Sequence, residues 1–164
     1  MMKKNLALCM ALLLIASMVA CSGNVDDDDN VPLNNYYVMY NGVQLEVGVD
    51  MNNYVSKLGD YTSEDGEACG TDEKDVIYTL SGIEIETHVS GSSETVRQIK
   101  IVNDSQSTLK GITIGSTKDE VIAAYGKEYK EGSTGALRYE GDTSAIEFHF
   151  GVSGNVSNVY IKRK

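Results

Sequence analysis

The chain has 164 residues, with 24 acidic against 14 basic side chains and a formal net charge of −10. A surface this acidic repels the phosphates of nucleic acids and of anionic lipids, so we expect no nucleic-acid partner and no membrane attachment through a basic patch. Beyond the N-terminal region, about 130 residues remain, which is enough for one compact domain.

Residues 1–20 have the layout of a secretory signal. Lys3 and Lys4 give a positive start, the stretch from Leu6 to Ala20 is apolar, and small residues stand near its end. This three-part pattern is typical of a signal peptide, and the stretch is shorter than the ~20 apolar residues that a membrane-spanning helix needs. We therefore expect residues 1–20 to be absent from the mature protein.

The end of this stretch, Met18-Val-Ala-Cys21, resembles the lipobox of bacterial lipoproteins, with Met18 where that family usually has Leu. The resemblance implies that a diacylglyceryl group is attached to the Cys21 thiol. It also implies an extracytoplasmic protein that is held to a membrane by this lipid. The alternative is an ordinary signal peptide that is cut nearby and leaves Cys21 as a free thiol.

Residues 21–37 are interpreted as the lipidated N-terminus and an acidic tether. The segment is polar, contains the run Asp26–Asp29 and has few apolar residues, so we expect it to be extended and disordered. A calcium loop needs spaced ligands and a turn glycine, and therefore the four aspartates are expected to be solvated instead.

Residues 38–164 make up one domain whose two halves, about 38–103 and 107–164, share a frame. An apolar segment in each half ends at a glycine, Gly48 or Gly115, and another glycine stands eleven residues further on. This recurrence predicts an internal repeat.

A short helix is predicted between the paired glycines of each half. In the second half, Thr117 and Glu120 have the spacing of a capping box, and Gly126 stands where a helix commonly ends. In the first half, Asp50 is the expected cap and Gly59 the expected end. Helices this short are marginal alone in water, so they must pack on a sheet. The apolar stripe of the first helix is Met51, Tyr54, Val55 and Leu58.

Each helix is followed by a polar stretch and by three segments with the alternation of apolar and polar residues that is typical of strands. The spacing of apolar residues from Val96 to Ile101 recurs from Val156 to Ile161. We predict an α+β fold, a tandem repeat of strand, helix and three antiparallel strands, with about eight strands and two short helices packed on one sheet face. The predicted segments after the helices are 76–80, 83–89, 95–102, 136–140, 145–150 and 155–162.

The sequence GITIGSTKDEVIAAYG at 111–126 resembles a signature of tandem-repeat envelope proteins. These include the secreted β-lactamase inhibitor protein and small lipoproteins of the outer-membrane assembly machinery. The domain as a whole is similar to lipoproteins of gut Firmicutes that have no assigned activity. The resemblance covers about residues 40–162 and implies the fold, but fold alone carries no activity with it. The residues that match the Firmicutes group are Ala68, Cys69, Gly70, Asp75, Tyr78, Glu84, Ile85 and Thr87.

The polar side of the predicted strands carries four candidate functional residues, Glu84, Glu86, Glu147 and His149. We interpret them as a surface that interacts with another protein. A surface hydrolase that uses acidic residues is the alternative, and it requires two carboxylates at a fixed separation, one with a raised pKa.

Cysteine and histidine content indicates no further chemistry. Once Cys21 carries lipid, Cys69 is the one thiol left in the mature chain, so no intramolecular disulfide can form. The acidic neighbours of Cys69 raise its pKa and disfavour the reactive thiolate, so we expect a buried core cysteine, with a disulfide to another chain as the alternative. His88 and His149 are too few for the three protein ligands of a zinc site. We expect no catalytic residue, no metal and no cofactor.

The ten tyrosines are the one unusual enrichment. Tyr54 and Tyr125 fall on helix faces and are expected in the core, whereas Tyr36, Tyr37 and Tyr40 lie near the tether and are candidates for exposure. The sequence therefore predicts a monomeric, non-catalytic lipoprotein that binds a protein of the cell envelope. A hydrolase or a structural spacer are the competing interpretations.

Overall fold

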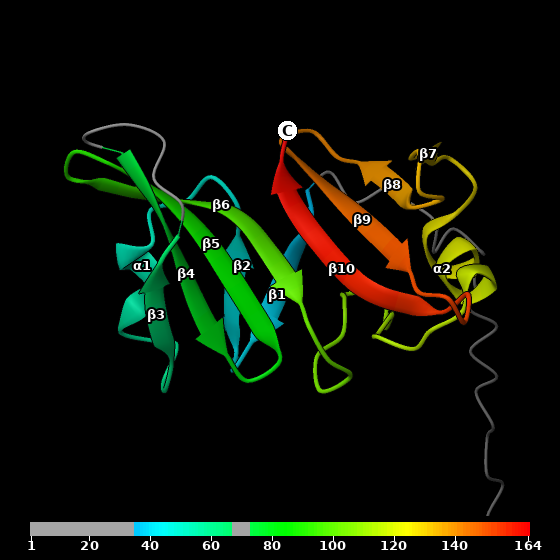
Figure 1. The fold of residues 1–164 in the computed structure, drawn as a ribbon, viewed down its shortest axis with the longest axis horizontal. Coiled ribbons are helices and arrows are strands. Elements are labelled where there is room, and N and C mark those ends of the chain that lie inside the picture. Colours follow the sequence, from blue (N-terminus) through cyan, green and yellow to red (C-terminus); the bar gives the residue numbers. More distant parts are fainter. Residues whose placement is uncertain (1–34, 67–72) are drawn as a thin grey trace, which may run out of the picture.

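The computed structural model describes residues 35–66 and 73–164, and Figure 1 shows their fold. The predicted signal peptide, Cys21, the run Asp26–Asp29 and Cys69 lie outside the described residues. The helices are α1 (Asn52–Val55) and α2 (Lys118–Tyr125). The strands are β1 (Tyr37–Tyr40), β2 (Val43–Glu46), β3 (Thr62–Asp65), β4 (Glu73–Leu80), β5 (Ile83–Ser90), β6 (Ser93–Ile101), β7 (Lys130–Glu131), β8 (Leu137–Glu140), β9 (Ser144–Phe150) and β10 (Val156–Arg163).

Eight of these strands form one antiparallel sheet in the order β3-β4-β5-β6-β10-β9-β8-β7, and β1 and β2 form a separate hairpin. Each half of the chain contributes a meander of four strands to the large sheet. The meanders meet where Gln98–Ile101 of β6 pairs with Val159–Lys162 of β10. The molecule is thus a sheet-rich α+β domain, in agreement with the predicted fold class. The predicted strand before each helix is not part of the large sheet, because β2 pairs only with β1 and residues 111–115 form no strand.

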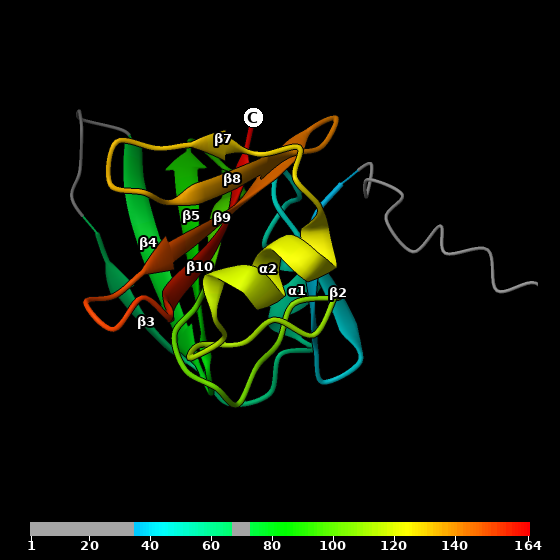
Figure 2. The same cartoon turned by 90° about the vertical axis from the view of Figure 1, so that its right-hand side faces the viewer.

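The large sheet is covered on one face and open on the other. Figure 2 shows α1, α2 and the β1–β2 hairpin on the same side of the sheet. Side chains that point into this layer, such as Ile85, Ile99 and Phe148, are at most 1 % exposed. Burial of such apolar surface supplies the main force for folding. The opposite side, formed by the intervening residues of each strand, is called the outer face below.

The helix that the capping box predicts is confirmed. The Thr117 side chain accepts a hydrogen bond from the Glu120 N–H at 3.2 Å, and the Glu120 carboxylate accepts one from the Thr117 N–H at 2.7 Å. The helix α2 ends at Gly126, which has a φ of 88°. The first helix is shorter than predicted, since α1 ends at Val55, and its N-cap is Met51 instead of the predicted Asp50. The Asp50 carboxylate accepts the Asn52 N–H at 2.9 Å just before the helix.

Two of the three tyrosines near the tether, Tyr36 and Tyr40, are in the core and are therefore not available as an exposed surface. Tyr36 directly precedes β1, and Tyr40 is the last residue of β1. Each is 5 % exposed, because the β1–β2 hairpin packs against the covered face of the large sheet. The Tyr36 N–H donates to the Ser144 hydroxyl at 2.7 Å, and the Tyr36 ring lies 6.2 Å from that of Tyr125. Sequence position next to a polar linker did not indicate this tertiary contact.

The apolar residues from Val96 to Ile101 in β6 and from Val156 to Ile161 in β10 have the same spacing because each strand contains a bulge. The register between β5 and β6 shifts at Arg97, and the register between β9 and β10 shifts at Ser157. Each shift marks a β-bulge, in which one extra residue interrupts the two-residue period. The flanking Val96 and Val156 both accept a backbone hydrogen bond, from Gly48 at 2.7 Å and Gly115 at 2.8 Å.

Two glycines in hairpin turns provide a matched test of packing. Gly82 and Gly42 have φ values of 85° and 79°, so alanine is strained at both positions by about 1 kcal/mol. A Cβ at Gly82 would also stand 2.4 Å from the Ser105 hydroxyl oxygen, whereas a Cβ at Gly42 meets nothing within 4 Å. We expect Gly82→Ala to lower the free energy of unfolding by roughly 2 kcal/mol more than Gly42→Ala in chemical denaturation. Equal losses would contradict the tight packing of the loop around Ser105.

Candidate functional site

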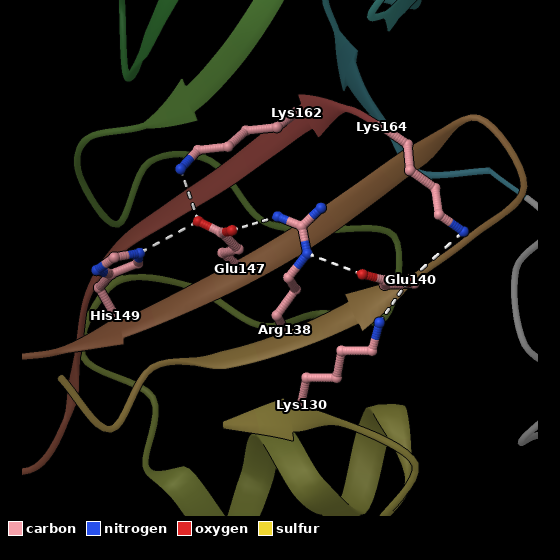
Figure 3. A network of polar contacts seen from close by, with 7 residues as sticks. All are labelled: Lys130, Arg138, Glu140, Glu147, His149, Lys162 and Lys164. Carbon is pink, nitrogen blue, oxygen red and sulfur yellow. Dashed lines mark hydrogen bonds and ion pairs between the residues drawn. The ribbon is translucent and has the colours of Figure 1, made fainter. Parts of the chain in front are cut away.

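The centre of the candidate site is a carboxylate on the outer face, Glu147 of β9. Its neighbours in register are Arg138 on β8 and Tyr160 on β10. Glu147 accepts hydrogen bonds from Arg138 and from the Lys162 ammonium, the latter at 2.7 Å, and lies 3.4 Å from the His149 Nε2 (Figure 3). The Glu147 side chain is 14 % exposed, so three neighbouring strands largely enclose this charge.

The network continues towards the β8–β9 turn. Arg138 Nε donates to Glu140 at 3.2 Å, and Glu140 also pairs with Lys130 at 3.0 Å and with Lys164 at 3.5 Å. Positive and negative side chains thus alternate across β7, β8, β9 and β10, as Figure 3 shows. The arrangement leaves no buried polar side-chain atom without a partner in the described parts of the chain.

The cations hold both carboxylates in the ionised form. Burial alone would raise the pKa of Glu147, but hydrogen bonds from Lys162 and Arg138 outweigh burial and lower the pKa to about 2. Hydrogen bonds from Lys130 and Arg138 lower the pKa of Glu140 to about 2 as well. Neither carboxylate can therefore donate a proton near neutral pH.

A second group of charges occupies the outer face of the first half. Asp75 lies 2.9 Å from the His88 Nδ1, and both of its oxygens accept from the Arg97 guanidinium, at 3.0 and 2.9 Å. Burial disfavours the charged form of Asp75, but the bonds to His88 and Arg97 prevail and lower its pKa. Glu86 accepts from the Gln98 amide at 3.2 Å, and Glu84 pairs with Lys100 at 2.8 Å.

All four residues that the sequence singles out lie on strands of the large sheet, at positions that alternate with buried ones. Glu147 and His149 contact each other, whereas Glu84 and Glu86 are engaged by partners on β6. Among the described residues, no ion pair or hydrogen bond joins Glu84 to Glu147 or His149. The four residues therefore belong to one face but to two separate clusters.

Three functional candidates were missed by sequence reasoning: Arg138, Tyr160 and Lys162. The His149 ring packs edge-on against Tyr160 at 4.9 Å, and the Lys162 ammonium lies 4.9 Å from the centre of the Tyr160 ring. The alternation of apolar residues in β8 and β10 already places these three side chains opposite the core. Their position next to Glu147 depends on the cross-strand register, which the alternation of apolar residues does not determine.

The site borders a shallow hollow next to the β7–β8 loop. This hollow has a volume of about 350 Å³ and includes Arg138, Glu147 and His149 in its wall. No group of three or more His, Cys, Asp and Glu side chains in residues 35–66 and 73–164 is arranged to hold a metal ion. In the same part of the chain, no helix is long and apolar enough to cross a membrane.

Comparison with known proteins gives a structural similarity alone. No family model and no curated protein matches the chain. A similar solved structure is that of an extracellular protein containing an SCP domain from Bacillus anthracis str. Ames, with a TM-score of 0.51 and 11 % sequence identity. The match covers 71 % of this chain and 43 % of that chain. At this identity the similarity concerns the fold, and it assigns no activity.

The ion pairs of Glu147 predict a pH-dependent contribution to stability. Because its folded pKa is about 2 and its ordinary value is 4.5, the contribution is present above pH 4.5 and is lost as the pH falls towards 2. Glu147→Gln should lower the free energy of unfolding at pH 7 by up to about 3 kcal/mol, since one pKa unit corresponds to about 1.4 kcal/mol. The deficit should shrink as the pH falls from 4.5 towards 2.

The control for this experiment is Glu128→Gln, since Glu128 is exposed and makes no ion pair with the described residues. Urea unfolding of both variants and the wild type between pH 2 and pH 7 measures the difference. A deficit of Glu147→Gln that stays constant over this range would contradict the assignment to charge.

Proposed function

We propose that the protein is an extracytoplasmic lipoprotein, anchored through Cys21, whose domain binds a partner protein of the cell envelope through the outer face. The observation that carries the proposal is the one-sided construction of the fold. Both helices and the β1–β2 hairpin cover one side of the large sheet, and the outer face is left open over both halves. Open sheet faces with ordered polar side chains are suited to recognition of another protein.

The outer face belongs to a domain that we interpret as two copies of one unit, about 38–103 and 107–164. The sheet order β3-β4-β5-β6 is mirrored by β7-β8-β9-β10. The bulges at Arg97 and Ser157, and the matching backbone bonds of Gly48 and Gly115, support the same interpretation. The face is therefore wide enough to contact a partner over strands of both units.

Tyr160 is the expected anchor of this interface. It is half-buried near the middle of the sheet on β10, between Glu147 on one side and Lys100 on the other. Tyrosine and arginine are enriched among the residues that carry most of the energy of protein interfaces. The charged pairs around Tyr160 are already fixed before a partner arrives, which lowers the entropy lost on binding.

A hydrolase is less well supported. General acid catalysis by a carboxyl group near neutral pH needs a raised pKa. Every described carboxylate with a shifted pKa, namely Asp75, Glu120, Glu140 and Glu147, is shifted downward. These groups serve as fixed negative charges, which suits binding better than proton transfer.

The proposed location rests on the sequence of residues 1–21 and agrees with the description of the similar Bacillus anthracis protein as extracellular. Cells that express the full chain and are fed labelled palmitate should give a labelled, membrane-associated protein. Cys21→Ser should abolish the label and release the domain from the membrane fraction, whereas Cys69→Ser should change neither. Retention of the label in Cys21→Ser would exclude the proposed anchor.

The interface can be tested with a photoreactive residue placed on either side of the molecule. Substitution at Tyr160 should give a crosslinked adduct of one defined mass in intact envelopes. Substitution at Tyr61, which is 38 % exposed and packs on the Tyr78 ring away from the outer face, serves as the control. We expect Lys100→Glu to reduce the Tyr160 adduct several-fold. Equal adducts from both positions, or none from Tyr160, would count against the proposal.

A further inference from the structure

The junction of the two meanders opens into a cleft between β6 and β10, which is lined by residues of the outer face, such as Lys162, and by residues of the covered side, such as Val96. The strands β6 and β10 pair only from Gln98 to Ile101 and from Val159 to Lys162. Before Gln98, β6 turns to other partners, because the Val96 N–H donates to the Val49 carbonyl at 2.9 Å. Beyond Lys162, Arg163 pairs only with β9. The two strands therefore separate at the Arg97 bulge and leave a wedge between them.

This wedge has a volume of about 620 Å³, within the ~300–1,000 Å³ of typical ligand sites. Its wall contains four cations and a single carboxylate, Glu86, in a chain whose formal net charge is −10. Neutral donors and acceptors complete the wall, among them Thr95 and Gln98. The four cations are Arg97, Lys162, Arg163 and Lys164.

The cations of the wedge differ in how far they are already neutralised. Arg97 is held by Asp75, and Lys162 by Glu147. Lys164 makes a longer contact of 3.5 Å with Glu140 and donates to the Gly141 carbonyl. The backbone of Arg163 pairs with Ser144, but its exposed side chain, which lies beside Gly48, makes no hydrogen bond or ion pair with the described residues. Arg163 has no counterion, and the contact of Lys164 with Glu140 is long, so this part of the wedge favours the binding of an anion.

We propose that this wedge binds carboxylate side chains from an extended acidic segment of the partner protein, with Arg163 and Lys164 as the principal contacts. The inference rests on the proposed function and assigns the chemistry of the partner. The guanidinium of Arg163 can hold one carboxylate through two parallel hydrogen bonds, and the Lys164 ammonium can donate a hydrogen bond to the next carboxylate along the segment. Arg97 and Lys162 add positive charge at the narrow end.

The acidic remainder of the surface does not prevent such binding. At physiological ionic strength the Debye length is about 8 Å, so a ligand inside the wedge interacts mainly with the charges that line it. More distant carboxylates are screened. The interaction should therefore depend on the identity of the lining residues more strongly than on the net charge of the protein.

The test uses the mature full-length protein, labelled with ¹⁵N, and a capped hexaglutamate peptide as the probe. We expect shifts of the backbone signals of Arg97, Arg163 and Lys164 on titration, and none with capped hexaglutamine. The double variant Arg163→Ala, Lys164→Ala should bind at least about tenfold more weakly, the loss expected for removal of charge-assisted hydrogen bonds. Thermal unfolding of the double variant checks that it is folded.

The matched control is the double variant Lys57→Ala, Lys127→Ala, which removes the same charge from exposed lysines outside the wedge. It should weaken binding less than about twofold at physiological salt. Equal weakening by both double variants would overturn the proposal, as would signal shifts confined to other strands.

Replacement of Asp26–Asp29 by Asn should leave the affinity for hexaglutamate unchanged. A large gain would show that the tether itself occupies the wedge, and would overturn the assignment to a partner. If hexaglutamate fails to bind while the Tyr160 adduct persists, the proposed function stands and the inference about the acidic segment fails.

Discussion

The pairing of β6 with β10 is the contact on which the continuity of the sheet depends. Within the described residues, these four-residue segments are the one place where strands of the two meanders are hydrogen-bonded to each other. The bulges at Arg97 and Ser157 limit how far the pairing can extend, because each bends its strand just beyond the junction. The same geometry that joins the meanders thus also separates their far ends and creates the wedge.

The outer face shows how charge can be kept in a half-buried position. Glu147 loses much of its contact with water, which disfavours its ionised form, yet Lys162 and Arg138 more than compensate. Because every carboxylate in Figure 3 contacts at least two cations, the side chains hold each other in fixed positions. A surface ordered in this way can discriminate between partners, since a wrongly placed charge would disturb several pairs at once.

Much of the fold could be predicted from the sequence, because its causes are local. The two-residue period predicted β4, β5, β6, β8, β9 and β10, and the spacing of Thr117 and Glu120 predicted α2. The strand β3 was missed because Thr62–Asp65 is exposed and has no apolar alternation. The burial of Tyr36 and Tyr40 was missed because it depends on where the β1–β2 hairpin packs, and adjacent sequence does not determine that.

The candidate site could be predicted only in part. Alternation places Glu84, Glu86, Glu147 and His149 opposite the core, but it does not say which residues face each other on neighbouring strands. That register depends on the turns and on the two bulges, as the pairing of Arg138 with Glu147 shows. The wedge is still harder to foresee, since it requires the divergence of two strands that lie about sixty residues apart in the chain.

The large sheet ends on both sides in strands that are short and charged. One end is β3, with exposed Glu64 and Asp65, and the other is the two-residue β7, with Lys130 and Glu131. Such edges offer few free backbone groups to a foreign strand and make its approach unfavourable. Copies of this domain at high local concentration would accordingly stay separate instead of growing into a continuous fibre.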